Sequence, residues 1–184
     1  RPADSQWLFC RAEVSDSVSP ATLIVEPPDI RLATNNTRGG SMAENPFVGS
    51  WRIVSYVMEE NGEKTYPLGL SPTGYIMYGA DGYMSVCLVS SERSRFDVAQ
   101  WSDGTTSQKA AAFDGTISYA GPYTIGENTV THHVEAAWFP DMISEENTRA
   151  YTFEGNRLRL SIPPVEVDGG VRTGHLIWEK VQAK

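Results

Sequence analysis

The fold is decided by the stretch Gly49-Ser50-Trp51-Arg52-Ile53-Val54-Ser55-Tyr56-Val57. A glycine two residues before a tryptophan opens the first long run of strand-forming residues. Glycine permits a tight turn with positive φ, and tryptophan can fill the narrow end of a small barrel by burying about 150–250 Å². We therefore predict that Gly49 and Trp51 are structural residues at the closed end of a β-barrel. This prediction directs the search for function to the barrel interior.

Seven further segments have the character of strands. With the first, they are 50–59, 74–79, 82–89, 115–125, 129–138, 148–154, 157–162 and 172–182. Turn dipeptides such as Asn61-Gly62 and Asp81-Gly82 separate them, and these are strong hairpin signals. Short connections make consecutive strands neighbours, and eight strands can close on themselves. We predict an all-β fold, an eight-stranded antiparallel up-and-down barrel.

One segment, between residues 90 and 114, departs from the strand pattern. Thr105-Thr106-Ser107-Gln108 has the form of a capping box, and helix-forming residues follow it. The sequence predicts one short helix over 105–113. A helix on a long loop at a barrel mouth is suited to act as a lid, or it plugs one end.

The character of the chain changes near residue 41. Residues 1–41 contain scattered prolines and the polar run 34–41, whereas regular strand patterns follow from Met42 onward. We interpret 1–41 as a flexible N-terminal extension or a remnant of cloning. Residues 42–184 are then one barrel domain, a length that buries a substantial core.

The composition excludes several classes of partner. The net charge of −8 over 184 residues argues against binding to nucleic acid or to anionic membranes, which attract basic patches. No apolar run approaches the ~20 residues of a membrane-spanning helix. The two cysteines lie in regions of different character, which favours a reducing compartment over a disulfide framework. We expect a cytoplasmic protein.

Further motifs follow the first strand in order along the chain. They are Gly74-Tyr75-Ile76-Met77-Tyr78, Asp81-Gly82-Tyr83-Met84-Ser85-Val86, Lys109-Ala110-Ala111-Ala112-Phe113-Asp114-Gly115, His132-His133-Val134-Glu135, Phe139-Pro140, Arg149 and Leu176-Ile177-Trp178-Glu179-Lys180. With these motifs the chain resembles the lipocalin-like domain family, the small calycin-type barrels of bacteria and fungi, over nearly all of 47–182.

The resemblance implies a barrel whose interior holds one small apolar ligand. It also implies a possible chemistry, because some relatives with small barrels are biosynthetic cyclases or isomerases. Barrels of this kind usually place an arginine late in the last strand, over the first-strand tryptophan. Here that position holds Lys180, which is still able to cover the ring of Trp51 by a cation–π contact.

The strand 131–138 carries the candidate catalytic residues. Alternation places His133 and Glu135 on one face and His132 and Val134 on the other. In one interpretation the first, more polar face meets water. In the other, His133 and Glu135 point into the interior as a proton-transfer pair, because a histidine beside a carboxylate suits acid–base catalysis. The resemblance favours the second interpretation, and we take these two residues as the catalytic candidates.

Candidate ligand-binding residues come from several strands. Arg149 alternates with Tyr151 and Phe153, so these three share a face, and a buried arginine there needs an acceptor such as Glu135. Tyrosines are suited to line an apolar interior because each offers a ring and one hydroxyl. In a small barrel such rings also serve as core. The candidate ligand-binding residues are Tyr56, Tyr75, Tyr119, Tyr123, Arg149 and Tyr151.

Two hypotheses about function follow. In the first, the protein binds a small apolar or aromatic molecule, polyketide- or terpenoid-like. In the second, it is a cofactor-free cyclase or isomerase acting in the same interior. We expect no cofactor and no metal, since His132 and His133 point to opposite faces and cannot chelate one ion together. A set of His133, Glu135 and His175 would require all three to face inward.

Overall fold

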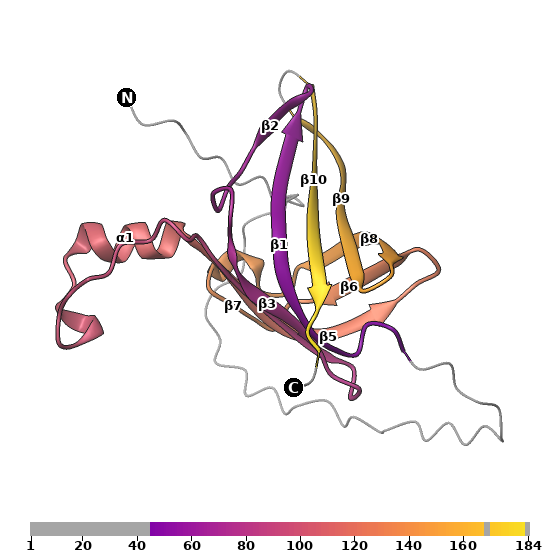
Figure 1. Ribbon diagram of the computed structural model, residues 1–184, viewed down its shortest axis with the longest axis horizontal. Helices are drawn as coiled ribbons and strands as arrows, with labels where there is room; N and C mark the ends of the chain where they lie inside the picture. The colour runs from indigo at the N-terminus through magenta and orange to yellow at the C-terminus, as the bar shows by residue number, and fades with distance from the viewer. Residues whose placement is uncertain (1–44, 168–169, 183–184) are drawn as a thin grey trace, which may run out of the picture. The chain divides into compact units, whose positions relative to one another are not determined.

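The strands of this protein form one closed antiparallel sheet (Figure 1). The computed structural model describes residues 45–167 and 170–182, and the prediction made for residues 1–41 lies outside them. The chain divides into two units between Met42 and Ala43. All of the described residues belong to the second unit.

The described residues form ten β-strands, one α-helix and two short 3₁₀ helices. In chain order they are β1 (Gly49–Glu60), β2 (Glu63–Thr65), β3 (Thr73–Tyr78), β4 (Tyr83–Val89), η1 (Trp101–Asp103), α1 (Thr106–Asp114), β5 (Thr116–Ile125), β6 (Thr129–His133), β7 (Ala136–Ala137), η2 (Pro140–Met142), β8 (Glu146–Glu154), β9 (Arg157–Val167) and β10 (Gly170–Lys180).

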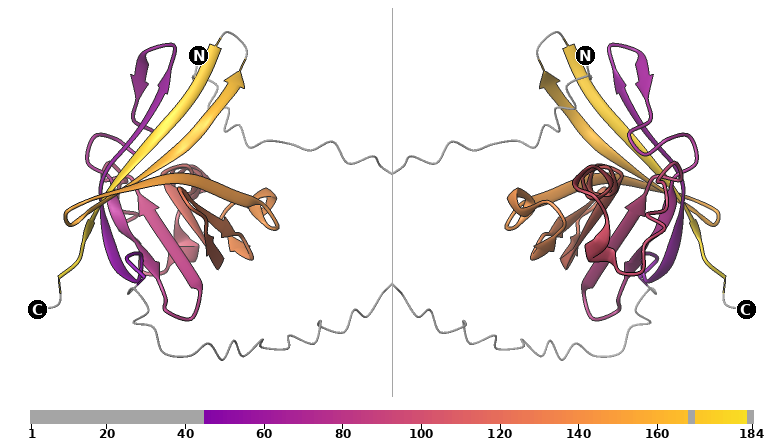
Figure 2. Two further views of the ribbon diagram at one scale, coloured as in Figure 1. Left: turned by 90° about the vertical axis from the view of Figure 1, so that its right-hand side faces the viewer. Right: turned by 90° about the vertical axis from the view of Figure 1, so that its left-hand side faces the viewer.

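Eight of these strands make the barrel. The ring runs β1–β3–β4–β5–β6–β8–β9–β10, and β10 pairs back onto β1. Strand β2 adds to β1, and β7 adds to β5. All of these pairings are antiparallel, and apart from the closing β10–β1 pair each pair within the ring joins barrel strands that follow one another along the chain. Figure 2 shows the ring from two sides, with β9 and β10 rising beyond its rim.

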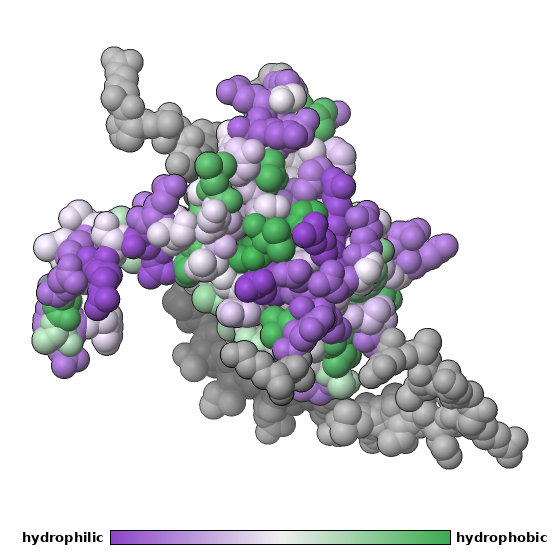
Figure 3. All heavy atoms as spheres, in the orientation of Figure 1, coloured by the Kyte–Doolittle hydropathy of each residue, from purple (hydrophilic) through white to green (hydrophobic). Residues whose placement is uncertain are grey.

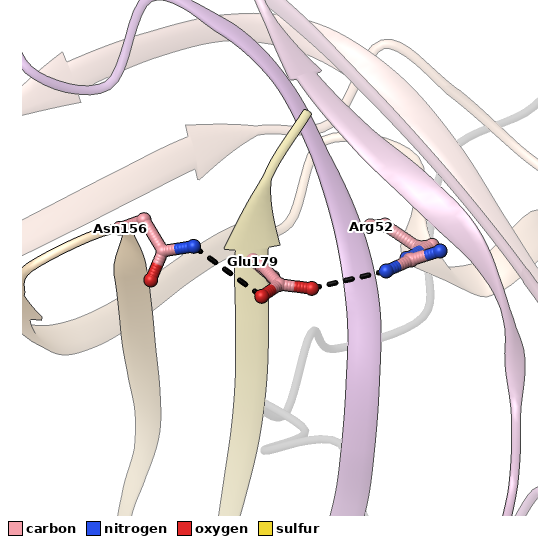
Figure 4. A network of polar contacts seen from close by, with 3 residues as sticks. All are labelled: Arg52, Asn156 and Glu179. Carbon is pink, nitrogen blue, oxygen red and sulfur yellow. Dashed lines mark hydrogen bonds and ion pairs between the residues drawn. The ribbon is translucent and has the colours of Figure 1, made fainter. Parts of the chain in front are cut away.

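The ring closes where the first and last strands pair. Trp51 lies opposite Lys180, and Arg52 lies opposite Glu179. On the outer face Arg52 Nη2 lies 3.0 Å from Glu179 Oε2, and Asn156 Nδ2 donates to Glu179 Oε1 at 3.3 Å (Figure 4). Because Asn156 lies in the turn before β9, this exposed network links three successive segments of the ring.

Two strands depart from the ranges expected from the sequence. Strand β9 continues to Val167, past Pro163 and Pro164, where the sequence pattern ends it at 162. Its pairing with β8 ends at Ser161, and a register shift in the ladder with β10 spans the two prolines. On the side of β8, Pro163 and Pro164 therefore have no partner strand, and their missing N–H groups break no ladder hydrogen bond there. Such unpaired strand edges are where proline is tolerated.

The expected strand 129–138 is instead two strands, β6 and β7. Between them Val134 turns away to bond the backbone of Glu145 and Ser144, while Glu135 N donates to Ala120 O at 3.0 Å. This crossing packs against Gly121 of β5, where an added Cβ would overlap the carbonyl oxygen of His133. A glycine is required because the two backbones approach more closely than any side chain permits.

The helix forms as its capping box predicts. Thr105 is the N-cap, Gln108 N donates to its hydroxyl at 3.2 Å, and Gln108 Oε1 accepts from Thr105 N at 2.9 Å. None of the residues of α1 is buried. Figure 1 shows α1 extending away from the strands, so it neither plugs the barrel nor packs on its core.

An aromatic cluster fills one end of the barrel. Phe47, just before β1, is fully buried and packs edge-on against Tyr78, Tyr151 and Phe153, with ring centroids 4.8–5.1 Å apart. Trp51 is 2% exposed and donates from Nε1 to Phe47 O at 2.7 Å. We call Phe47, Trp51, Tyr78, Tyr151 and Phe153 the aromatic plug. Burial of these aromatic side chains is the main contribution to stability at this end of the barrel.

Candidate functional site

Polar side chains gather on the inner side of the barrel beyond the aromatic plug. They come from five strands, and Tyr78 belongs to both groups. The members of this interior polar cluster are Tyr56 on β1, Tyr78 on β3, Tyr119 on β5, His132 on β6, and Asn147 and Arg149 on β8. Buried polar groups in such a number are uncommon in a small core, so this cluster is the candidate functional site.

His132 is the centre of the cluster. Its side chain is 1% exposed, and each ring nitrogen has a tyrosine hydroxyl as its partner. The hydroxyl of Tyr78 lies 2.8 Å from Nε2, and that of Tyr119 lies 2.9 Å from Nδ1. A neutral imidazole has one donor and one acceptor nitrogen, so one tyrosine donates to it and the other accepts. The accepting tyrosine keeps its own O–H for a third group.

The charge state of the cluster follows from burial. Burial, helped by the positive charge of Arg149, lowers the pKa of His132 to about 3, so the ring is neutral at pH 7. Burial raises the pKa of Tyr56 to about 12, against a smaller lowering by Arg149. The pKa values of Tyr78 and Tyr119 are also raised, chiefly by burial. The phenols therefore stay protonated, and they act as neutral donors and acceptors.

Arg149 and Asn147 lie together on β8 and share the inner face with Tyr151 and Phe153. One guanidinium nitrogen of Arg149 donates to Thr148 O at 2.8 Å, and the other donates to Asn147 Oδ1 at 3.3 Å. Both acceptors are neutral. Asn147 is 6% exposed, lies opposite His132 in the ladder, and its Nδ2 is buried with no hydrogen-bond partner among the described residues. Trp178 Nε1 on β10 and Trp138 Nε1, just after β7, are likewise buried without a hydrogen-bond partner among the described residues.

The expectation that His133 and Glu135 point inward is wrong. His132 and Val134 are buried instead, while Glu135 is exposed. His133 contacts groups of neighbouring strands at the surface, with Nε2 lying 3.0 Å from the hydroxyl of Thr124 and Nδ1 3.3 Å from Glu146 Oε1. The physical reason is that hydrophobic Val134 and the well-partnered imidazole of His132 lose less on burial than a carboxylate would. Glu135 consequently does not accept from Arg149.

The tyrosine candidates fall into three groups. Tyr56 and Tyr119 belong to the interior polar cluster. Tyr123 and Tyr151 face inward but bond backbone at the rim: Tyr123 donates to Gly79 O at 2.9 Å, and Tyr151 donates to Glu127 O at 3.3 Å. Tyr75 is 47% exposed and lies on the outer face, because Ile76 and Tyr78 take the inner positions of β3. Tyr75 is therefore not an interior ligand residue.

Tyr75 instead borders a shallow depression on the outside of the barrel. The depression, of about 320 Å³, lies over the closing strands and is lined by Arg52, Tyr75, Asn156, Glu179, Lys180, Val181 and Gln182. Figure 3 shows the face that carries β1 and β10, with apolar side chains near its middle and polar ones to either side. Two of its charged groups, Arg52 and Glu179, already pair with each other across the closing strands.

Several interior residues were not among the predicted site residues, Tyr78 among them. His132 and Asn147 were missed because the polar residues of a half-buried strand are normally assigned to the outer face. Phe47 was missed because it precedes the first strand. The sequence signal that could have identified His132 is that it alternates with the apolar Val130 and Val134 and so shares a strand face with them. Both valines are buried.

The described residues show neither a metal site nor a membrane-spanning helix. They contain no group of three or more His, Cys, Asp and Glu side chains arranged to hold a metal ion. His175, one of the histidines considered for such a group, lies with Nδ1 3.1 Å from the hydroxyl of Ser161. Within the same part of the chain, no helix is long and apolar enough to cross a membrane.

Comparison with known proteins gives one result. The family model described as a lipocalin-like domain matches residues 48–181, which include all eight barrel strands. Comparisons with curated proteins and with solved structures found no significant match. The matched range begins one residue after Phe47 and ends one residue after Lys180.

Proposed function

Because the chain belongs to the lipocalin-like domain family, we propose that its barrel binds one small, largely apolar molecule on the inner side of the strands. Barrels of this size hold a single small ligand or fill with side chains. Binding sites of this kind have mostly apolar and aromatic walls with a few polar groups that orient the ligand. The aromatic plug and the interior polar cluster supply both. The ligand class is apolar or aromatic, such as a polyketide- or terpenoid-like molecule.

The observation that carries this proposal is that two inward-facing donors, Asn147 Nδ2 and Trp178 Nε1, are buried without hydrogen-bond partners among the described residues. A third such donor, Trp138 Nε1, follows β7. Nine-tenths or more of buried polar groups in proteins have a hydrogen-bond partner, and leaving one unpaired costs about 1–3 kcal/mol. An acceptor atom on a bound molecule would remove this cost. Two such donors on the inner side of the barrel support an interior that binds a ligand. They argue against a core whose polar groups are all satisfied without one.

The test is direct binding. Native mass spectrometry of the purified protein is expected to reveal a co-purified small molecule, and the neutral dye phenylnaphthylamine is expected to fluoresce on binding. Leu176→Trp, which adds volume on the inner side of β10, should weaken dye binding by tenfold or more. Val54→Trp, which makes an equally large change on the exposed side of β1, should leave it unchanged. Absence of both a co-purified compound and dye binding would contradict the proposal.

A second candidate is a cofactor-free isomerase or cyclase, and the chain Tyr78–His132–Tyr119 favours it. An imidazole bonded on both nitrogens can take a proton at one while it releases a proton from the other. Such a chain returns to neutrality after each transfer, so it suits a double-bond shift or ring closure that neither gains nor loses atoms. In this candidate the acid–base role passes from His133 and Glu135 to His132 and its tyrosines.

Turnover separates the two candidates. The protein is incubated with its co-purified compound, and the products are examined for a species of equal mass and different retention. For an enzyme, Tyr119→Phe should lower turnover by ~10²–10⁴ and change affinity by only a few-fold, because acid–base groups act on the transition state. Tyr75→Phe, which removes a hydroxyl from the outer face, is the matched control. Recovery of unchanged compound with the wild-type protein would leave binding as the function.

A further inference from the structure

Arg149 differs from two other barrel arginines in having no carboxylate partner among the described residues. Arg52 pairs with Glu179, its Nη2 lying 3.0 Å from Oε2, and Arg172 pairs with Glu60, its Nη2 lying 2.6 Å from Oε2. Arg149 bonds only a backbone carbonyl and an amide oxygen within the part of the chain that the structure describes. Arg52 and Arg172 thus have carboxylate partners within the described residues, and Arg149 has none.

The charge of Arg149 faces the interior polar cluster. This charge adds to the lowering of the pKa of His132 on β6, and it opposes the raising of the pKa by burial at Tyr56 on β1 and Tyr119 on β5. None of these groups carries a negative charge at pH 7, because burial keeps the phenols protonated and the imidazole neutral. The cluster thus holds one permanent positive charge with neutral neighbours. A partly buried guanidinium in such surroundings favours an anion from outside the chain.

Asn147 adds a second donor beside the guanidinium. Its Oδ1 accepts from Arg149, and this contact leaves Nδ2 as the free end of the amide. That nitrogen is buried, unpartnered and on the inner face. An arginine and an amide that present only N–H groups make a site with two kinds of donor and no acceptor. A carboxylate, with two oxygens and a full charge, matches this set better than a neutral carbonyl.

We propose that the ligand of this barrel is a carboxylic acid, whose carboxylate binds Arg149 and Asn147 while its apolar part lies along the inner wall. This inference rests on the proposed binding function and adds the chemical class of the ligand head group. The neutral imidazole of His132, opposite Asn147, borders the head group without repelling it. The tyrosine that accepts from His132 has an O–H available as a third donor.

The test compares an acid with its ester. The probes are a dansyl-labelled medium-chain fatty acid and its methyl ester, and phenylnaphthylamine measures binding of a ligand without a head group. The acid is expected to bind at least tenfold more tightly than the ester, as charge-assisted hydrogen bonds to a carboxylate allow. Arg149→Gln should remove this preference and leave the ester affinity within a few-fold. Arg159→Gln, an equal change of charge on the exposed side of β9, should preserve the preference.

A second variant tests the charge without removing the arginine. Asn147→Asp places a carboxylate beside the guanidinium, so the acid should lose its advantage while the ester and the dye still bind. Equal affinities of acid and ester in the wild-type protein would overturn the inference and leave the binding function standing. An equal loss of acid and ester binding in both variants would overturn it as well, since it would assign Arg149 a structural role. If neither probe nor the dye binds, the binding function itself fails, and the inference with it.

Discussion

The ammonium group of Lys180 lies over the indole of Trp51, with Nζ 4.4 Å from the ring centroid. The same nitrogen donates to Val48 O at 2.7 Å and to Pro46 O at 3.2 Å. One side chain of the last strand thus covers the tryptophan of the first strand and satisfies carbonyls of the segment that leads into it. The contact ties together the two strands whose pairing closes the ring.

Replacing this tryptophan is expected to be among the costliest single changes in the barrel. Trp51→Ala removes a side chain that is 2% exposed and leaves a cavity against Phe47 and Phe153, so it should lower the free energy of unfolding by about 3–5 kcal/mol. Trp101→Ala removes a side chain that is 83% exposed and serves as the control. Equal denaturation midpoints for the two variants in urea would contradict the structural role of Trp51.

The buried neutral histidine predicts a particular dependence of stability on pH. The pKa of His132 in the folded protein, about 3, lies below its ordinary value of 6.5, so the unfolded chain binds more protons between these values. Its contribution is fully present above pH 6.5 and is lost as the pH falls toward 3. In that window the free energy of unfolding should fall by up to about 1.4 kcal/mol for each pH unit.

Comparison of two neighbouring histidines isolates this effect. Urea denaturation between pH 6.5 and 4.5 should show a smaller slope for His132→Gln than for the wild-type protein. His133→Gln, which removes an imidazole from the outer face and leaves the His132 ring in place, is the control. Burial also lowers the pKa of His175, so some slope remains in the first variant. If His132→Gln and the wild-type protein have the same slope, the ring of His132 is not held neutral by the fold.

The barrel itself could be predicted from the sequence because its signals are local. Turn dipeptides mark the strand ends, the capping box marks α1, and the positions of Trp51 and Lys180 at opposite ends of the domain follow from the closing of an up-and-down ring. Their pairing in the β1–β10 ladder is the register that brings the ammonium over the indole.

The interior could be predicted only in part, because alternation defines two faces of a strand without stating which is inside. On β8 the apolar Tyr151 and Phe153 identify the inner face and carry Arg149 with them. On β6 the apolar Val130 and Val134 indicate the inner face, but burial of the polar His132 between them depends on partners from other strands, the hydroxyls of Tyr78 and Tyr119. Such partners are set by the register of strands distant in sequence, which no pattern within 129–138 reveals.

The crossing of backbones at Gly121 predicts a severe effect for a small substitution. In Gly121→Ala the new Cβ would overlap the carbonyl oxygen of His133, which cannot move without shifting β6. We expect a loss of about 1–3 kcal/mol, the range for overpacking, and a change in the NMR signals of the His132 ring. Gly126→Ala meets mainly the movable hydroxyl of Thr129 and should cost less. A tolerated Gly121→Ala would show that the crossing is looser than described.

The outer network at the closing strands predicts a measurable carboxyl titration. Hydrogen bonds from Arg52, above all, and Asn156 lower the pKa of Glu179 below its ordinary value of 4.5. Following the Glu179 carboxyl by NMR, we expect Arg52→Gln to move the titration toward that ordinary value, and Arg157→Gln to move it much less. Because Glu179 is exposed, neither variant should alter the denaturation midpoint appreciably at pH 7. An unchanged titration in Arg52→Gln would rule out the contact in solution.

Pairing of the first and last strands also decides how this domain can be combined with other proteins. Val181 N donates to Ser50 O at 2.9 Å, so the two ends of the folded domain leave it side by side. A unit with adjoining ends can be inserted into a surface turn of a host protein without a long linker. By the same geometry its ends can be joined by a short peptide and new ones opened at a hairpin such as Asp81-Gly82. The paired ends of β1 and β10 are therefore the place where the barrel is most readily joined to another protein.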